Sequence, residues 1–421
     1  MIADRIRREP YESIENFWRR FVDDYYEKKP CVIDLQNINI DLISEIDCLN
    51  ILKKAFSPNL KKMTKSRYAK RIQIDNKNID NDIIDNSYLD PDKDSFIEFI
   101  EKYASNKNFK DLKFIIHNCQ SYYNPILEKG KNFLKNIFEI SGIPGALVDT
   151  DIFAGKYLTD IKGIHKDCGG VFMFPIVGNK TMASWPFEYF SGYLSPEKNI
   201  YSNAELENVD YKKHLENAYI MTSNSRGIIY FPSHWWHLAV SESLEPVMCF
   251  NLTVYLPMPL LNIVKPVIDK VMMELEKTSA YIFNFDNFQY PHTLTNLRNI
   301  ILPVEIRKFT ENLEKNLKLN YLQKISDMGF LNSHEHTRSL ANDSFIHGNK
   351  TFPIMNITDH DNSILIANSR IINCKSSKSL DKLIELLNSG NIFSWYQLKE
   401  DYQEFVKLLE KLYAIDAIRV A

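Results

Sequence analysis

The sequence lacks three features that would place the protein in familiar classes. Its six cysteines form no C-x-x-C pair and no paired spacing, so neither a zinc cage nor a disulfide framework is indicated. No segment approaches eighteen consecutive apolar residues, and the amino-terminal stretch MIADRIRREPYESIENF is charged throughout. We therefore expect a chain that is neither exported nor membrane-spanning and that works in a reducing cytoplasm.

An excess of charge of either sign is also missing. The 421 residues carry 51 Lys and Arg against 54 Asp and Glu, and the formal net charge is −3. The chain as a whole has no net positive charge to attract phosphate groups or an anionic membrane. The composition therefore weighs against nucleic acid as a partner, and we expect no membrane partner.

A short pattern in the segment GIHKDCGGVFMFPIVGNK, residues 163–180, predicts a metal site. His165 and Asp167 are separated by one residue, so in an extended strand their side chains project from the same face. A third ligand can come from RGIIYFPSHWWHLAVS, residues 226–241. The alternation of strand side chains favours His237, with His234 as the alternative. Two imidazoles and a carboxylate on one face of a metal leave the opposite positions open, as in non-haem Fe(II) oxygenases.

A lysine follows this pattern at the end of an apolar segment. VFMFPIV has the length and composition of a buried strand, and the turn-like Gly178-Asn179 leads to Lys180. A buried ammonium is costly without an anionic partner. A dicarboxylate cosubstrate would be such a partner.

With these motifs the sequence resembles the JmjC-type, cupin-fold 2-oxoglutarate oxygenases, most closely the bacterial-type ribosomal oxygenases and the asparaginyl-hydroxylase-like members. The resemblance implies that His165, Asp167 and His237 bind Fe(II), that Lys180 pairs with the distal carboxylate of 2-oxoglutarate, and that O2 is the second cosubstrate. It also implies that Trp235 and Trp236 help to form the cavity wall.

Other positions are less clearly assigned or depart from the family pattern. The resemblance implies that Asn251 lies near the metal or cosubstrate. The alternative is that Asn251 is a sheet residue whose hydrogen bonds are satisfied within the protein. Arg226-Gly227 stands where a Gly-Asp turn is usual. Lys162 replaces the hydroxylated residue often found three positions before the first histidine, and it is the alternative base for the cosubstrate.

The length suits two or three domains. We expect an α+β protein. Short strands and turn signals recur up to residue 257, which suits a jelly roll, and the resemblance makes residues 1–257 a double-stranded β-helix (jelly-roll, cupin, JmjC) catalytic domain. From Met258 the apolar spacing becomes helical. The resemblance makes residues 258–332 a helical dimerisation module, hence a homodimer. The alternative is that both helices pack on the barrel of a monomer.

Residues 333–421 are similar in predicted element order to a winged-helix domain. From residue 341 onward nine Lys or Arg stand against ten Asp or Glu, which disfavours DNA and favours a polypeptide partner or a structural role. Four histidines at the start of this region lack the spacing of a second metal site, and their surroundings indicate a loop: His334, His336, His347 and His360.

The expected function is an Fe(II)- and 2-oxoglutarate-dependent dioxygenase that hydroxylates a side chain of a protein or peptide. Two alternatives remain. The same chemistry could remove an N-methyl group, or the chain could be a cupin-like binding module without chemistry.

Overall fold

The computed structural model of the 421-residue chain forms two compact units. Met1–Pro257 and Met328–His334 make up the first unit, and Met258–Asp327 with Glu335–Ala421 make up the second. The structure describes residues 1–38, 40, 43–55, 70–74, 77–79, 95–107, 111–123, 125–144, 147–157, 163–195, 200, 202–206, 209–240, 244–255, 260–278, 304–330 and 340–421.

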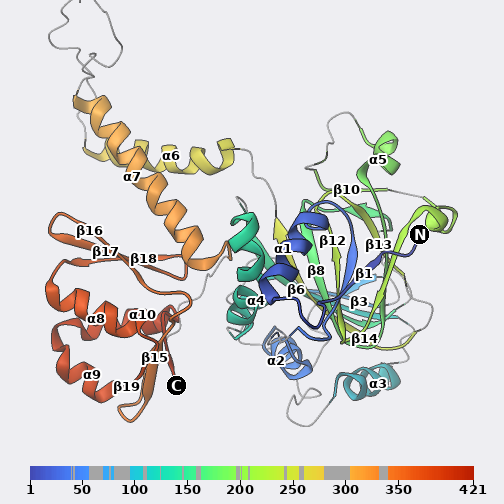
Figure 1. Ribbon diagram of the computed structural model, residues 1–421, viewed down its shortest axis with the longest axis horizontal. Coiled ribbons are helices and arrows are strands. Elements are labelled where there is room, and N and C mark those ends of the chain that lie inside the picture. The colour runs from blue at the N-terminus through green and yellow to red at the C-terminus, as the bar shows by residue number, and fades with distance from the viewer. Residues whose placement is uncertain are drawn as a thin grey trace, which may run out of the picture. The chain divides into compact units, whose positions relative to one another are not determined.

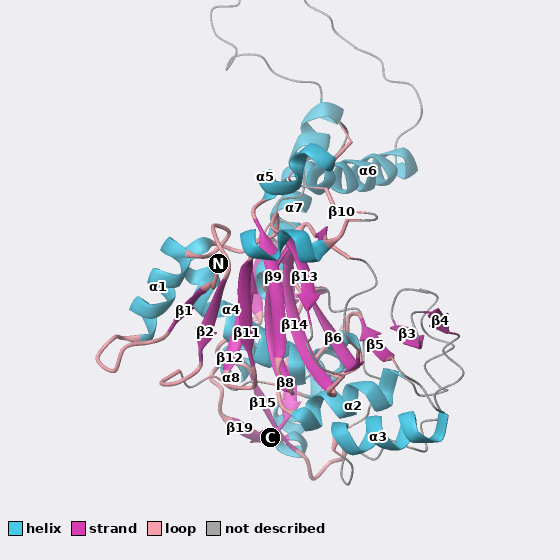
Figure 2. Cartoon of the chain, turned by 90° about the vertical axis from the view of Figure 1, so that its right-hand side faces the viewer, coloured by secondary structure: helices cyan, strands magenta, loops and turns pink. Residues whose placement is uncertain are grey.

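Two sheets build the first unit (Figures 1 and 2). One has nine strands in the order β1-β2-β12-β8-β14-β6-β5-β3-β4, and the other has five in the order β10-β7-β13-β9-β11. All neighbouring strands pair antiparallel except β1 and β2. The strands are β1 (Asp4–Ile6), β2 (Cys31–Asp34), β3 (Lys70–Ile74), β4 (Lys77–Ile79), β5 (Leu112–Ile116), β6 (Val148–Lys156), β7 (His165–Lys166), β8 (Gly169–Val177), β9 (Lys180–Trp185), β10 (Ala204–Glu205), β11 (Tyr219–Ser223), β12 (Gly227–Phe231), β13 (Trp236–Val240) and β14 (Val247–Tyr255).

The alternation of side chains along β8 separates the helix-covered core from the interior of the roll. Phe172 lies against Phe133 of a helix, with ring centroids 5.1 Å apart. Val171 and Met173 face the other way and line an interior cavity. The strand is therefore apolar on both faces, as its sequence predicted.

Helices cover the outer face of the nine-stranded sheet. Trp18 packs edge-on against Phe133, with ring centroids 5.5 Å apart. Figure 1 shows the two helices that carry these rings beside the strands of this sheet. The helices of the unit are α1 (Ile14–Asp24), α2 (Glu45–Ala55), α3 (Phe96–Lys107), α4 (Pro125–Ser141) and α5 (Phe187–Phe190).

The second unit combines a helix pair with two small sheets. The helices α6 (Leu260–Thr278) and α7 (Val304–Asp327) form the pair that the periodicity predicted. Two three-stranded antiparallel sheets run in the orders β19-β15-β20 and β16-β17-β18. The other elements are β15 (Phe345–Gly348), β16 (Met355–Asp359), β17 (Asn362–Ala367), β18 (Arg370–Lys375), α8 (Lys378–Asn388), β19 (Ile392–Ser394), α9 (Trp395–Asp401), α10 (Val406–Ala414) and β20 (Ile418–Val420).

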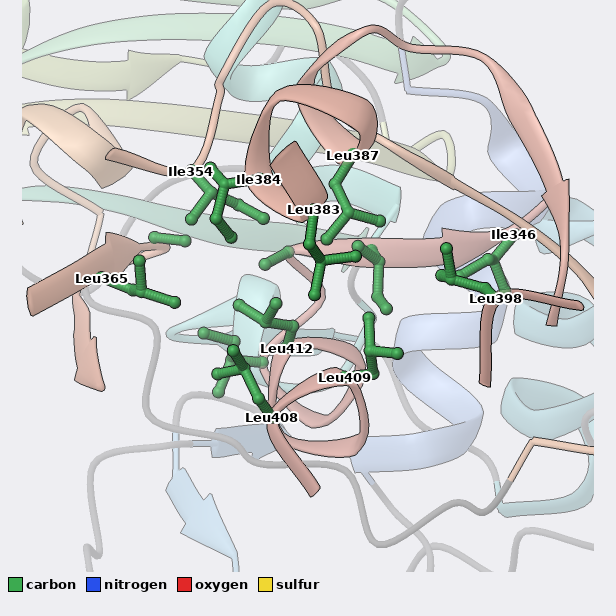
Figure 3. Close-up of a cluster of buried hydrophobic side chains, with 14 of the residues drawn as sticks. Ile346, Ile354, Leu365, Leu383, Ile384, Leu387, Leu398, Leu408, Leu409 and Leu412 are labelled. Atoms are coloured by element: carbon green, nitrogen blue, oxygen red, sulfur yellow. The ribbon is translucent and has the colours of Figure 1, made fainter. Parts of the chain in front are cut away.

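Leucine and isoleucine side chains of α8, α10 and the strands make the core of the carboxy-terminal part (Figure 3). The predicted hairpin is confirmed, because β17 and β18 are joined by Asn368 and Ser369, both in the left-handed region with φ of 45° and 62°. Ser377 caps α8, since its side chain accepts a hydrogen bond from the backbone N–H of Leu380.

The prediction of a loop around the second group of histidines is wrong at His347. This residue lies in β15, which pairs with both β19 and β20. His360 does lie at a turn, between β16 and β17. His334 and His336 fall outside the described residues. Among the helices of the described ranges, none combines the length and apolar character needed to cross a membrane.

Candidate metal centre

Neighbouring strands bring the proposed ligands together. β7 and β13 pair antiparallel with His165 directly opposite His237, and the two ring centroids are 4.3 Å apart. Asp167 follows immediately after β7, and its Oδ2 lies 3.7 Å from Nε2 of His237. One ligand atom from each residue lies within 4.8 Å of the other two. A single cation at their centre could contact all three.

Hydrogen bonds on the far side of each imidazole fix which nitrogen can bind a metal. Nδ1 of His165 is 2.9 Å from the carbonyl oxygen of Gly163, and Nδ1 of His237 is 3.1 Å from that of Trp235. A carbonyl oxygen can only accept, so each Nδ1 carries the proton. Each Nε2 lone pair is therefore available as a ligand.

The three residues border a cavity of about 570 Å³ between the two sheets. Both imidazoles are buried, whereas the Asp167 side chain is 34% exposed. Asn203 and Glu205 also line the cavity and are exposed, and the Asn203 side chain accepts a hydrogen bond from the backbone N–H of Cys168, so the cavity is open to solvent beside Asp167.

Lys180 is placed inside this cavity by the first residue of β9. It is buried, and its Nζ donates a hydrogen bond of 3.1 Å to the hydroxyl oxygen of Tyr157. The same Nζ lies 4.9 Å from the centroid of the Tyr157 ring. The cavity thus has a cationic group among its lining residues, as a site for an anionic ligand needs.

Asn251 faces the cavity from β14, with Thr253 two positions further along the same face. It is buried, yet in the described part of the chain no group donates to its Oδ1. A buried acceptor in this state costs about 1–3 kcal/mol. A bound ligand that donates a hydrogen bond would suit this acceptor.

The structure adds a histidine and a carboxylate to the lining of the cavity, with a second carboxylate nearby on the same strand, and none of them belongs to a sequence motif. His117 and Asp151 both line the cavity, and Nδ1 of the one is 2.7 Å from Oδ1 of the other. Burial, and then the charge of Asp151, raise the pKa of Asp149 to about 6. The alternating VDTDIF sequence of β6 was the available signal, because it puts both carboxylates on one face of a strand.

Several other candidates have different surroundings. His234 lies half-buried in the turn before β13, where burial lowers its pKa, and it is not part of the three-ligand cluster. Lys162 is outside the described residues.

Neither Trp235 nor Trp236 lines the cavity, so the prediction that they help to form its wall is wrong. Trp236 neighbours His237 and so points to the opposite face of β13, where it packs in an outer cluster. Trp235 packs edge-on against Tyr219.

Fold and ligand arrangement together define a jelly roll whose facing sheets enclose a potential mononuclear metal centre. No family model matches the chain, and no curated protein matches it. Among solved structures, that of E. coli YcfD is similar with a TM-score of 0.50 at 14% identity, over 96% of this chain and 98% of that one.

Two further structures are of YcfD, a ribosomal oxygenase from Escherichia coli, with cobalt. The complex with 2-oxoglutarate has a TM-score of 0.48 at 14% identity, and the complex with succinic acid has 0.46 at 15%. Each comparison covers 96% of this chain and 98% of the YcfD chain. The likeness at a TM-score of 0.50 and 14% identity shows the fold alone, and with the strand pairings it confirms the expected mixed fold with antiparallel sheets.

Proposed function

We propose that the protein is an Fe(II)- and 2-oxoglutarate-dependent oxygenase that hydroxylates a side chain of a protein or peptide. The observation that carries the proposal is the cluster of three ligand atoms within 4.8 Å on the wall of a cavity that also holds a buried lysine. Two imidazoles and one carboxylate are the donor set of non-haem Fe(II) oxygenases, and they leave coordination positions open.

Each residue of the site has a role in this proposal. His165, Asp167 and His237 hold the metal, Lys180 binds the distal carboxylate of 2-oxoglutarate, and Asn251 accepts a hydrogen bond from a bound ligand. When bound, iron and 2-oxoglutarate supply the oxidising power for C–H hydroxylation by O2, with succinate and CO2 as the coproducts. The chain itself orients the ligands and limits the access of water.

The polypeptide substrate follows from the resemblance of the sequence to the ribosomal oxygenases. The winged-helix-like region and the helix pair α6–α7 belong to this part of the proposal, the first as a peptide-recognition module and the second as the contact of a homodimer. We place the protein in the cytoplasm, with no nucleic acid and no membrane as partners. The near-equal charge counts after residue 341 support the exclusion of nucleic acid.

Removal of an N-methyl group is a second candidate, because hydroxylation of such a group gives an unstable hemiaminal with the same site. A binding module without chemistry is disfavoured, since it has no need for a three-ligand cluster, a buried lysine and an unsatisfied amide around one cavity.

Succinate formation tests the proposed chemistry. The purified protein with Fe(II), 2-oxoglutarate and air should release succinate, measured by NMR, and the yield should rise with a true substrate. Asp167→Asn, which removes a charged ligand, should abolish the release. Equal succinate from this variant and the wild type would contradict the proposal.

A further inference from the structure

A second lysine lies in the interior of the roll, on a strand that contains none of the sequence motifs of the site. Lys113 is the second residue of β5, and only 2% of its surface is exposed. Lys113 and Ile115 face the cavity, whereas Leu112 and Phe114 on the alternate positions belong to the core. An apolar residue would fill this interior position at a lower cost in desolvation free energy than the ammonium of Lys113. An anionic ligand in the cavity would offset that cost.

The ammonium groups of Lys113 and Lys180 both lie over the ring of Tyr157. Its Nζ lies 4.5 Å from the centroid of the Tyr157 ring, and Nζ of Lys180 lies 4.9 Å from that centroid. Both distances are within the range of cation–π attraction, about 6 Å. Two buried cations from different strands thus share one aromatic ring.

This arrangement fixes the hydrogen-bonding direction of the phenol. The hydroxyl oxygen of Tyr157 accepts from Lys180 at 3.1 Å, so its own proton is directed to another acceptor. Across from Lys113 on the neighbouring strand β6 is Gly155, which contributes no side chain at that level. The carboxylates that line the same cavity are Asp151, which pairs with His117, and Asp167 and Glu205.

We propose that Lys113 is a specificity-determining residue for the acid that binds beside the metal. Together with Lys180 and Tyr157 it makes a doubly cationic group on the cavity wall. This group selects a 2-oxo acid with a second carboxylate at its far end over one that ends in an alkyl group. The inference rests on the proposed function, because the 2-oxo acid is the expected cosubstrate.

Binding, measured without turnover, tests this role. Isothermal titration under argon of the Fe(II)-loaded protein compares 2-oxoglutarate with 2-oxopentanoate, which has the same 2-oxo acid end and no distal carboxylate. In Lys113→Met, which keeps a chain of similar length, the affinity for 2-oxoglutarate should fall about tenfold, while that for 2-oxopentanoate stays the same. Lys113→Arg should restore most of the difference. Should the Met variant be unstable in thermal unfolding, Lys113→Gln gives the same comparison.

If Lys113→Met loses affinity equally for both acids, the role of Lys113 is purely structural and the inference is overturned. Unchanged affinity for both acids would also overturn it. Lys180→Met separates this failure from that of the proposed function. If the wild type binds 2-oxoglutarate and Lys180→Met binds it more weakly, but Lys113→Met binds it at full affinity, only the inference about Lys113 falls. If the wild type binds neither acid, both fall.

Discussion

Both imidazoles of the candidate metal centre are oriented by the backbone of their own segments. His165 and His237 each donate from Nδ1 to a carbonyl two residues earlier in the chain. This local arrangement explains why the short motifs sufficed to find these residues. The neighbours that do not belong to a motif, such as Tyr157 and Lys113, could not be found in the same way. They reach the cavity through strand pairings with distant parts of the chain.

Lys180→Ala tests the assignment of the cosubstrate base. The change removes a charge-assisted hydrogen bond worth about 1.5–3 kcal/mol, so the affinity for 2-oxoglutarate should fall roughly tenfold to a hundredfold. Fe(II) binding should stay intact, because the three ligand residues lie outside β9. Calorimetric titration of each ligand measures both. If the affinity for 2-oxoglutarate is unchanged, another base holds the acid, and Lys162 becomes the first candidate.

Asp149 should make the stability of the protein depend on pH. Its folded-state pKa of about 6 is above the ordinary 3.8, mainly because of burial. The folded state therefore holds the proton more tightly, and the free energy of unfolding should fall as pH rises from about 4 to about 6. The size is on the order of 1–3 kcal/mol.

Asp149→Asn keeps the Oδ1 acceptor, which receives hydrogen bonds from Gln120 and Thr150, and removes the titration. Urea unfolding of the metal-free protein between pH 4 and 7 should show a shallower loss of stability in this variant. Parallel pH profiles for the variant and the wild type would mean that the carboxyl does not titrate in this range.

At the scale of the elements, the sequence predicted strands and helices whose signal is local. The amphipathic α1 and the apolar β8 were visible in this way. β15 was missed, since only its pairing with β19 and β20 makes its sequence a strand. His237 and Trp236 are neighbours on β13 and so project from opposite faces, which explains why Trp236 does not have the place in the cavity wall that the resemblance had suggested for both tryptophans.

Phe172 on β8 tests how the sheet is attached to its helices. Its ring centroid lies 5.8 Å from that of Phe21, 5.1 Å from Phe133 and 4.8 Å from Tyr230. Phe172→Ala should therefore cost about 3–5 kcal/mol of stability in urea unfolding. Phe345→Ala is the control, because that side chain is 56% exposed, and it should change stability by less than about 0.5 kcal/mol. Similar costs for the two variants would contradict this packing.

At the scale of the whole chain, a segment after the helix pair returns to the first unit. The backbone N–H of Val148 donates to the carbonyl of Gly329 at 2.9 Å, and Phe330 forms a bridge with Val148. Apolar spacing could not predict this return, because it depends on the pairing of Val148 with residues as far along the chain as Gly329 and Phe330. A truncation that is meant to keep the first unit intact must therefore end after Phe330.

Cutting the chain at residue 340 tests the proposed division of labour. Fe(II) binding and 2-oxoglutarate decarboxylation without substrate should persist, because the ligands and Phe330 remain. Hydroxylation of the true substrate should be impaired, since the proposed recognition module is gone. Light scattering should give twice the chain mass for the intact protein. Strong, salt-sensitive binding of the intact protein to duplex DNA would contradict the account, because such binding needs an excess of positive charge.

An anaerobic Fe(II) titration of the wild type, His237→Ala and His234→Ala tests the central claim most directly. The wild type should bind one Fe(II) per chain. His237→Ala should lose this binding and all 2-oxoglutarate turnover, because it removes an Nε2 ligand, whereas His234→Ala, altered only in the nearby turn, should still bind the metal. Loss of binding in His234→Ala with full binding in His237→Ala would contradict the assigned metal centre.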